Sequence, residues 1–165
     1  MYGYYFFILF LCFCIAPGCA LQKSPSNDQL VAEAQAFMEG YAQDLRTRDG
    51  TAVAARYNRS GHYMLGAGHK LFISYDSLRV EYEERWQGPD SFEWQDLSYE
   101  PISSNAIMVL GKFIWGNDNF EEPGLFSYSG LLVRQDGELR IRVEDYSSDP
   151  MSMKEFICES DSTAG

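Results

Sequence analysis

The chain has 165 residues and a formal net charge of −11 at pH 7, so it is long enough for one domain with a modest core. Residues 1–22 carry no charge, which places the whole acidic excess on the remainder and argues against binding to the phosphate backbone of nucleic acids. Two of the four cysteines fall in the apolar leader, and the other two, Cys19 and Cys158, are too few for a disulfide framework.

The leader is almost wholly apolar and aromatic, and it ends in a Pro-Gly-Cys sequence at Cys19. Such a run is too short and too quickly broken for a spanning helix and is typical of a secretory signal peptide. Its end resembles a bacterial lipobox, which implies cleavage after residue 18 and acylation of Cys19. Because Ala20 follows, the resemblance also implies location at the outer membrane. We therefore expect a signal peptide at residues 1–18, a lipidated tether at residues 19–26 and a periplasmic protein that contacts the membrane through the lipid alone. A plain signal peptide or an uncleaved anchor is the alternative.

The first half of the chain carries helical signals. Ser26 and Gln29 form a capping-box pair, and apolar residues then recur at helical spacing as far as Leu45. Ser74 is the predicted N-cap of a later helix, which Gly88 and Pro89 end. The predicted elements of this half are helices at residues 27–48, 52–57 and 75–86 and short strands at residues 61–66 and 70–73.

Strand patterns dominate the second half. The apolar positions of residues 92–99 change parity at Gln95–Asp96, so we expect a bulge there that bends the sheet. Residues 106–115 are apolar on both faces apart from Lys112, as in a central strand. A loop at residues 116–124 leads into a hairpin at residues 125–148, and the tail at residues 149–165 could form a short helix.

The hairpin is the clearest pattern of the chain. A three-residue turn ending at Gly137 would pair Arg134 with Glu138. In the last strand Leu139, Ile141 and Val143 alternate with charged residues, so they share one buried face, and this face ends in Asp145. That register places Ser127 opposite Asp145 and Ser129 opposite Val143.

The order of helices followed by antiparallel strands predicts an α+β domain. Four segments, at residues 49–57, 61–68, 106–113 and 139–147, resemble the NTF2-like superfamily, specifically its SnoaL-like and ketosteroid-isomerase-like members. The resemblance spans residues 27–148 and implies a cone-shaped (cystatin-like) fold, with N-terminal helices packed on a strongly curved antiparallel sheet around a pocket. Many small members carry Trp, Ile, His and Ser on the last strand. This chain has Leu139, Ile141, Asp145 and Ser147 there, so no role of that His carries over, and the isomerase residues find no matching positions.

The face of Leu139 and Ile141 is predicted to be concave, together with Phe113 and Trp115 of the central strand. Asp145 is the candidate catalytic residue, because a desolvated aspartate has a raised pKa and can act as acid, base or ligand anchor. The alternatives are that Asp145 is solvated at the strand end and that the aromatic residues are simply core. The candidate pocket residues are Ser127, Ser129, Asp145, Phe113, Trp115, Tyr41, Tyr57, Tyr82 and Trp86.

Neither a metal site nor a cofactor is predicted. His62 and His69 are the only histidines, and their spacing supplies no third ligand, so surface or core positions are favoured. The first functional hypothesis is an exported, lipid-anchored module that binds a small apolar ligand or an envelope protein without catalysis. The alternative is an isomerase, cyclase or dehydratase that uses Asp145 with a pocket tyrosine.

The opposite face of the predicted sheet is rich in apolar residues, and contiguous patches of this kind usually mark an interface. Both this pattern and the resemblance favour a homodimer through the convex face. The alternative is that the tail at residues 151–158 covers the patch. The residues predicted on this face are Met108, Leu110, Ile114, Phe126, Tyr128 and Leu132.

Overall fold

The computed structural model describes residues 25–66, 69–117 and 123–148. The predicted signal peptide, Cys19 and the predicted tail helix lie outside these ranges. None of the described helices is long and apolar enough to cross a membrane. In chain order the elements are α1 (Asn27–Thr47), α2 (Gly50–Ala55), β1 (His62–Gly66), β2 (His69–Ile73), α3 (Tyr75–Val80), a π-helical turn η1 (Glu81–Arg85), β3 (Ser91–Ser103), β4 (Ala106–Gly116), β5 (Gly124–Gln135) and β6 (Glu138–Ser148).

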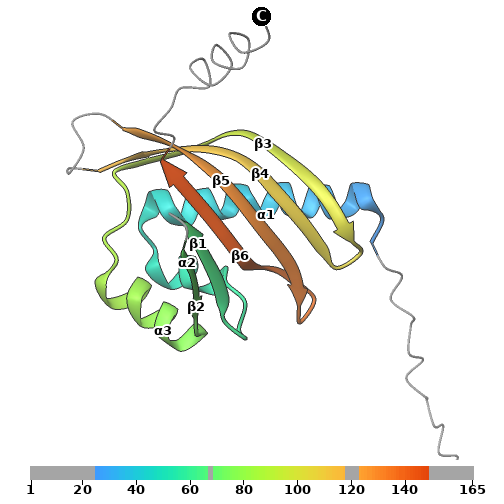
Figure 1. The fold of residues 1–165 in the computed structure, drawn as a ribbon, viewed down its shortest axis with the longest axis horizontal. Coiled ribbons are helices and arrows are strands. Elements are labelled where there is room, and N and C mark those ends of the chain that lie inside the picture. Colours follow the sequence, from blue (N-terminus) through green and yellow to red (C-terminus); the bar gives the residue numbers. More distant parts are fainter. Residues whose placement is uncertain (1–24, 67–68, 118–122, 149–165) are drawn as a thin grey trace, which may run out of the picture.

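The strands form one sheet in the order β2-β1-β6-β5-β4-β3, antiparallel except where β1 runs parallel to β6. The long strands bend over α1, and α2 and α3 gather at one end of the curve (Figure 1). The predicted bulge in β3 is confirmed, because the register shifts between Gln95 and Ser98 and Asp96 has a φ of 52°. This architecture confirms the α+β expectation of helices packed on a curved sheet.

Helix α1 packs against the concave face of the sheet. Its predicted capping box is present, since the Gln29 N–H donates to Ser26 Oγ at 3.3 Å and the Ser26 N–H donates to Gln29 Oε1 at 2.9 Å. One face of the helix is buried against the sheet, and each large apolar side chain there contributes about 1.5–3 kcal/mol. The buried residues of α1 are Leu30, Ala34, Phe37, Met38, Tyr41, Ala42 and Leu45.

The turn of the last hairpin has two residues rather than the predicted three. Gln135 pairs with Glu138 and Arg134 with Leu139, and Asp136 and Gly137 both have positive φ, of 53° and 87°. This is the type I′ geometry that Asp-Gly favours in two-residue hairpins. The expected pairing of Arg134 with Glu138 is therefore wrong by one residue, and a shift of one residue turns every side chain of β5 to the other face.

A second irregularity lies in β6. Leu132 pairs with Ile141 but Leu131 pairs with Val143, so Arg142 is an extra residue that forms a β-bulge. The Arg142 guanidinium donates to the backbone carbonyls of Ser60 and Gly61, just before β1. Because the bulge resets the alternation, the inner face continues with Glu144 and Tyr146, whereas Val143 and Asp145 face outward.

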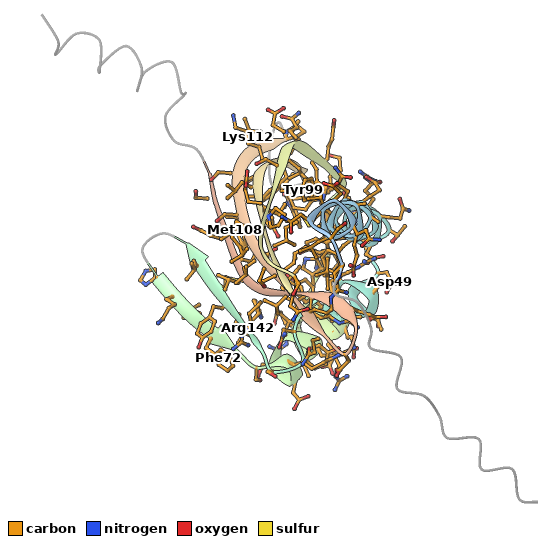
Figure 2. All side chains as sticks on the ribbon, turned by 90° about the vertical axis from the view of Figure 1, so that its right-hand side faces the viewer. Asp49, Phe72, Tyr99, Met108, Lys112 and Arg142 are labelled. Carbon is orange, nitrogen blue, oxygen red and sulfur yellow. The ribbon has the colours of Figure 1, made fainter. Side chains whose placement is uncertain are left out.

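These two shifts change the predicted faces of the sheet. Ile107, Val109 and Phe113 of β4 face α1 as expected, and Met108, Leu110 and Ile114 face away from it. Figure 2 shows Met108 on the outer side of the sheet, away from α1. Phe126, Tyr128 and Leu132, predicted on the convex face, instead face the inside, because they pair with the inward residues Phe113, Gly111 and Ile107. Leu125, Leu131 and Val133 take their place on the outer face, opposite Ile114, Met108 and Ala106.

Candidate ligand-binding site

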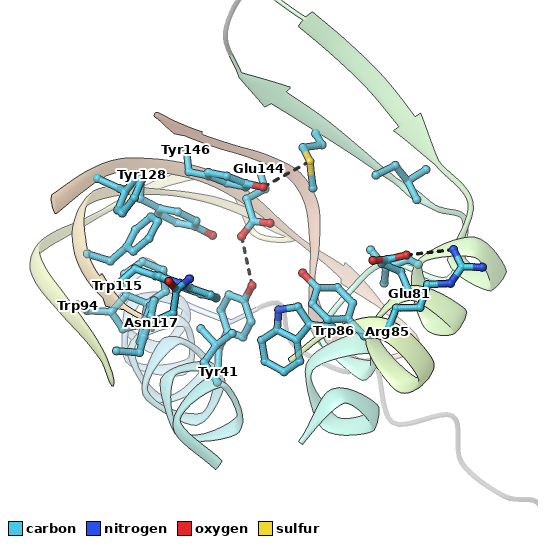
Figure 3. Close-up of a pocket in the computed structure, with 18 of the residues that line it drawn as sticks. Tyr41, Glu81, Arg85, Trp86, Trp94, Trp115, Asn117, Tyr128, Glu144 and Tyr146 are labelled. Atoms are coloured by element: carbon cyan, nitrogen blue, oxygen red, sulfur yellow. Dashed lines mark hydrogen bonds and ion pairs between the residues drawn. The ribbon is translucent and has the colours of Figure 1, made fainter. Parts of the chain in front are cut away.

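The concave side of the sheet is not completely filled. A cavity of about 670 Å³ opens between β3–β6, α1 and the α3–η1 segment (Figure 3). The narrow part of the cone is closed by fully buried side chains such as Ile107, Leu132 and Ile141, and the cavity occupies the wider part. The aromatic residues that line it are Tyr41, Tyr82, Trp86, Phe92, Trp94, Phe113, Trp115, Phe126, Tyr128 and Tyr146.

The aromatic wall is ordered by the pairing of β3 with β4. Phe92 lies opposite Trp115 and Trp94 opposite Phe113, which places four rings on one inner surface. Phe92 and Trp94 meet edge to face at 4.8 Å, and Trp94 and Phe113 do so at 5.7 Å. The Trp94 indole N–H also donates to the Met38 carbonyl at 3.0 Å, which fixes this ring against α1. The rings of the wall therefore pack against one another and against α1.

Among the described residues that line the cavity, Glu144 is the one charged residue that is buried, with 4 % of it exposed. The Tyr57 hydroxyl donates to Glu144 Oε2 at 2.8 Å, and the Tyr41 hydroxyl donates to Oε1 at 3.4 Å. The hydroxyl oxygens of Tyr41 and Tyr82 lie 2.9 Å and 3.0 Å from that of Tyr57. We call Glu144, Tyr41, Tyr57, Tyr82 and Tyr128 the Glu144–tyrosine cluster.

Tyr128 completes this cluster from β5. Its hydroxyl is buried, makes no hydrogen bond of ordinary geometry and points toward Glu144 (Figure 3), close enough to help lower the pKa of that carboxyl. Gly130, which lies opposite Glu144 in the sheet, leaves room for the Tyr128 ring to lie over it and so to reach Glu144. A Cβ atom at residue 130 would collide with the Tyr128 hydroxyl oxygen. The glycine is thus required by a close approach.

Burial dominates the electrostatics of the site. It raises the pKa of Glu144 to about 7, although the hydrogen bond from Tyr57, the nearby Tyr128 hydroxyl and the hydrogen bond from Tyr41 act in the opposite direction. Burial and the nearby Glu144 carboxyl also raise the pKa of each tyrosine in the cluster, so these hydroxyls stay protonated near neutral pH. None of the ion pairs among the described residues includes Glu144. The carboxyl can therefore exchange a proton near neutrality or hold a hydrogen-bond donor.

His62 lies behind the cluster on β1. It is 0 % exposed, its ring centroid is 4.7 Å from that of Tyr57, and neither ring nitrogen has a hydrogen-bond partner among the described residues. Burial, and then Arg142, lower its pKa to about 4, so the ring is neutral near pH 7. It does not line the cavity, and His69 is exposed on β2. Among the described residues, no three His, Cys, Asp or Glu side chains converge as metal ligands.

Most of the predicted aromatic residues lie at the site. Tyr41, Tyr82, Trp86, Phe113 and Trp115 line the cavity, and Tyr57 reaches the cluster from behind.

The predicted polar patch lies elsewhere. Ser127, Ser129 and Asp145 are on the outer face, where Ser129 pairs with Asp145 and the Ser127 hydroxyl contacts the Ser147 hydroxyl at 2.8 Å. The two-residue turn moves Ser127 and Ser129 to the outer face, and the bulge at Arg142 exchanges the positions of Asp145 and Glu144. Glu144 was missed because it alternates with arginines, as a solvated face does. The Asp-Gly dipeptide was an available signal for the shorter turn.

No family model matches the chain, and no curated protein is similar to it in sequence. Solved structures are similar in fold. An NTF2-like protein from Shewanella oneidensis has a TM-score of 0.62 at 13 % identity and covers 72 % of this chain and 99 % of its own. A ketosteroid isomerase-like protein from Erwinia carotovora atroseptica has a TM-score of 0.58 at 20 % identity and covers 76 % and 100 %. A candidate scytalone dehydratase from Novosphingobium aromaticivorans has a TM-score of 0.56 at 12 % identity and covers 73 % and 84 %.

The chain therefore has an NTF2-like fold, as its resemblance to that superfamily predicted. At these identities the likeness concerns the fold alone. Within this fold the chain has an aromatic cavity that ends at a buried glutamate surrounded by tyrosine hydroxyls.

Proposed function

We propose that this protein binds a small, largely apolar molecule in the aromatic cavity, with a polar group of that molecule at the Glu144–tyrosine cluster. The observation that carries this proposal is the cavity itself, about 670 Å³ of open space walled by aromatic rings and ending at one buried carboxyl. Ligand sites in proteins commonly measure about 300–1,000 Å³ and are mostly apolar with a few convergent polar groups.

The buried carboxyl supports a functional reading of this cavity. A group that is buried and ionisable costs stability unless it is neutralised or paired, and an apolar side chain of similar size would pack against the same tyrosines without that cost. The likeness in fold to ketosteroid isomerase-like and dehydratase-like proteins is consistent with a small-molecule site.

Intrinsic fluorescence provides the test, because the three tryptophans of the chain, Trp86, Trp94 and Trp115, all line the cavity. We expect small aromatic and alicyclic compounds to quench or shift this emission saturably. Ser77 lies at the cavity and is exposed, so Ser77→Phe should narrow the cavity and weaken binding. Thr51→Phe adds the same ring on α2, away from the cavity, and should leave binding unchanged. Equal binding by both variants would place the ligand elsewhere.

A second candidate function is proton transfer by Glu144. The specific observation in its favour is a carboxyl with a pKa of about 7 beside tyrosine hydroxyls that can donate to a developing oxyanion. In such a reaction the carboxylate takes a proton from the carbon next to a ketone carbonyl. The electron pair of that bond moves to the carbonyl oxygen as an enolate, and the proton later returns from Glu144.

Deuterium exchange tests this second function without knowledge of the substrate. In D₂O the protein should catalyse exchange of the α-protons of a bound cyclic ketone such as 2-tetralone, followed by NMR, and Glu144→Gln should abolish the catalysis. Asp145→Asn, which removes the neighbouring outward carboxylate, should not. If the ketone saturates the site and its α-protons still exchange at the uncatalysed rate, the protein binds the ketone but does not catalyse proton transfer.

We also propose, from the sequence alone, that the protein is exported and anchored to the outer membrane through an acylated Cys19, which lies outside the described residues. Metabolic labelling with an alkynyl palmitate should tag the wild-type chain and not Cys19→Ser. Equal labelling of the two would contradict the anchor.

We further propose that two copies associate through the outer face of the sheet. Leu110 and Leu125 are 41 % and 44 % exposed there, next to Met108 and Ile114. Leu110→Glu should dissociate such a dimer in sedimentation velocity, whereas Leu132, which is buried, is not a suitable probe of this surface. A wild-type monomer at micromolar concentration would overturn the proposal.

A further inference from the structure

The Glu144 carboxyl lacks a positive partner in the described structure. Its hydrogen-bond partners are tyrosine hydroxyls, and no arginine, lysine or histidine forms an ion pair with it. Among the described residues that line the cavity, Arg85 is the one cationic residue, and it pairs with Glu81 at 3.4 Å. Figure 3 shows this pair to one side, away from Glu144. A buried carboxylate without a counter-charge is a place where a ligand can supply one.

The hydroxyl network is arranged to receive an ionised carboxylate. Each tyrosine has one hydroxyl proton, and Tyr57 donates its proton to Glu144, so the Tyr82 hydroxyl donates to the Tyr57 oxygen. The Tyr41 hydroxyl lies within reach of both Tyr57 and Glu144 and can donate its proton to one of them at a time. The chain of donors therefore ends at the carboxylate as acceptor. Hydrogen bonds of this kind stabilise the charged form of an acid.

The aromatic walls of the cavity also favour a positively charged ligand. Trp86, Trp94 and Trp115 line it together with Phe113 and Tyr128, and the faces of such rings attract cations. Within the described residues, four cationic side chains lie over aromatic rings: Arg56, Arg59, Lys70 and Arg142. The rings that they cover, those of Phe37, Tyr63, Phe72 and Tyr75, do not line the cavity. The cavity rings are thus unoccupied by cations of the protein. The net charge of −11 further raises the local concentration of cations.

We propose that the ligand of this cavity is a small organic cation, a protonated or quaternary amine with an aromatic or alicyclic body, whose ammonium group lies against Glu144 and the surrounding rings. This inference rests on the proposed ligand-binding function and names the chemical class that the site selects. The apolar body occupies the aromatic wall, and the charge of the ligand replaces the missing partner of Glu144.

Binding of a cation is linked to the protonation of Glu144. The groups that face this carboxyl are Tyr41 from α1, Tyr57 after α2, Tyr82 from η1, Tyr128 from β5 and Tyr146 from β6, with His62 behind Tyr57 and the Glu81–Arg85 pair at the mouth. The tyrosine pKa values are raised and that of His62 is about 4, so among Glu144, these tyrosines and His62 it is Glu144, with a pKa of about 7, that changes charge between pH 5 and 8.

The linkage has a definite sign. A cation binds the ionised carboxylate, so its affinity is greatest above pH 7 and falls by about tenfold for each pH unit below the pKa of Glu144, or roughly hundredfold at pH 5. The same binding event lowers the pKa of Glu144 and releases a proton. A ligand that accepts a hydrogen bond from protonated Glu144 would show the opposite dependence on pH.

The test compares aryl-alkyl trimethylammonium ions, from benzyltrimethylammonium to its naphthylmethyl analogue, with carbon isosteres in which a tert-butyl group replaces the trimethylammonium. The full-length chain is held in lipid nanodiscs, and empty nanodiscs correct for partition of the probes into lipid. Tryptophan emission reports occupancy, and calorimetry in two buffers of different ionisation enthalpy reports proton release.

We expect the cations to bind at least about hundredfold more tightly than their isosteres at pH 8, with a loss of roughly hundredfold at pH 5. Glu144→Gln should remove the preference for cations and keep the binding of the isosteres, which also shows that the variant is folded. Asp145→Asn makes the same change of charge on the outer face and should bind as the wild type does. The pH dependence and proton release of the wild type test the inference even if Glu144→Gln does not fold.

The outcomes separate the two proposals. Isosteres that bind as tightly as the cations, or an affinity for cations that rises on acidification, would overturn the cationic ligand and leave the proposed ligand-binding function standing. Absence of saturable binding by both series at millimolar concentration would overturn both.

Discussion

Replacement of Glu144 by glutamine should change how the stability of the protein depends on pH. Burial raises the pKa of Glu144 from an ordinary value of 4.5 to about 7, so the folded state holds a proton that the unfolded state has released between these two values. In that window stability falls as pH rises, by about 1.4 kcal/mol per pH unit and about 3 kcal/mol in total. Above pH 7 the loss is complete, and below pH 4.5 it is absent.

Protonation of His62 has the opposite effect on the pH dependence of stability, over nearly the same pH range. Its pKa is lowered from 6.5 to about 4, so the unfolded state binds a proton that the folded state does not, and stability rises with pH by a similar total of about 3 kcal/mol. The two contributions nearly cancel in the wild type between pH 4.5 and 6.5. We therefore expect Glu144 and His62 together to change the free energy of unfolding of the wild type little between pH 4.5 and 6.5. Near pH 7 Glu144 alone titrates, and stability falls.

Urea unfolding of the chain from Gln22 onward, at intervals from pH 4 to 8, measures these contributions. The free energy of unfolding of Glu144→Gln, relative to the wild type, should increase by about 3 kcal/mol from pH 4.5 to 7.5. Asp145→Asn, with the same chemical change on the outer face, should show no such increase. A difference between Glu144→Gln and the wild type that is the same at pH 5 and pH 8 would refute the buried, neutral carboxyl.

Three further substitutions have defined outcomes. Gly130→Ala should displace Tyr128 and destabilise the fold by about 1–3 kcal/mol in urea unfolding, and Ser129→Ala, on the other face, should cost far less. Tyr57→Phe removes the 2.8 Å hydrogen bond to Glu144, so the pKa of Glu144 should rise and the pH dependence described above should move to higher pH, which pH-dependent unfolding would detect. Ser26→Ala should reduce stability by about 1 kcal/mol through loss of the capping box, and an unchanged urea midpoint would contradict the cap.

Local sequence was sufficient for much of the fold. The Ser26–Gln29 pair begins α1, and the parity change at Gln95–Asp96 marks the bulge of β3, because caps and bulges are specified by residues that are neighbours in the chain. Helical and alternating periodicities likewise indicated the α+β class. Five aromatic residues of the cavity could be identified as inward from the sequence, although not as the wall of an open space: Tyr41, Tyr82, Trp86, Phe113 and Trp115. Phe126 and Tyr128 were expected on the convex face and line the cavity instead.

Only the tertiary structure decided which carboxylate enters the cone. A strand has a period of two, so one inserted residue exchanges Asp145 for Glu144 at the inner face. The bulge at Arg142 is accompanied by bonds from its guanidinium to Ser60 and Gly61, about 80 residues earlier in the chain, and no local pattern predicts such a contact. The cluster of tyrosines is non-local in the same way, since Tyr41, Tyr57, Tyr82 and Tyr128 come from four separate segments. Sequence determined what each element is, and the packing between distant elements determined which side chains meet.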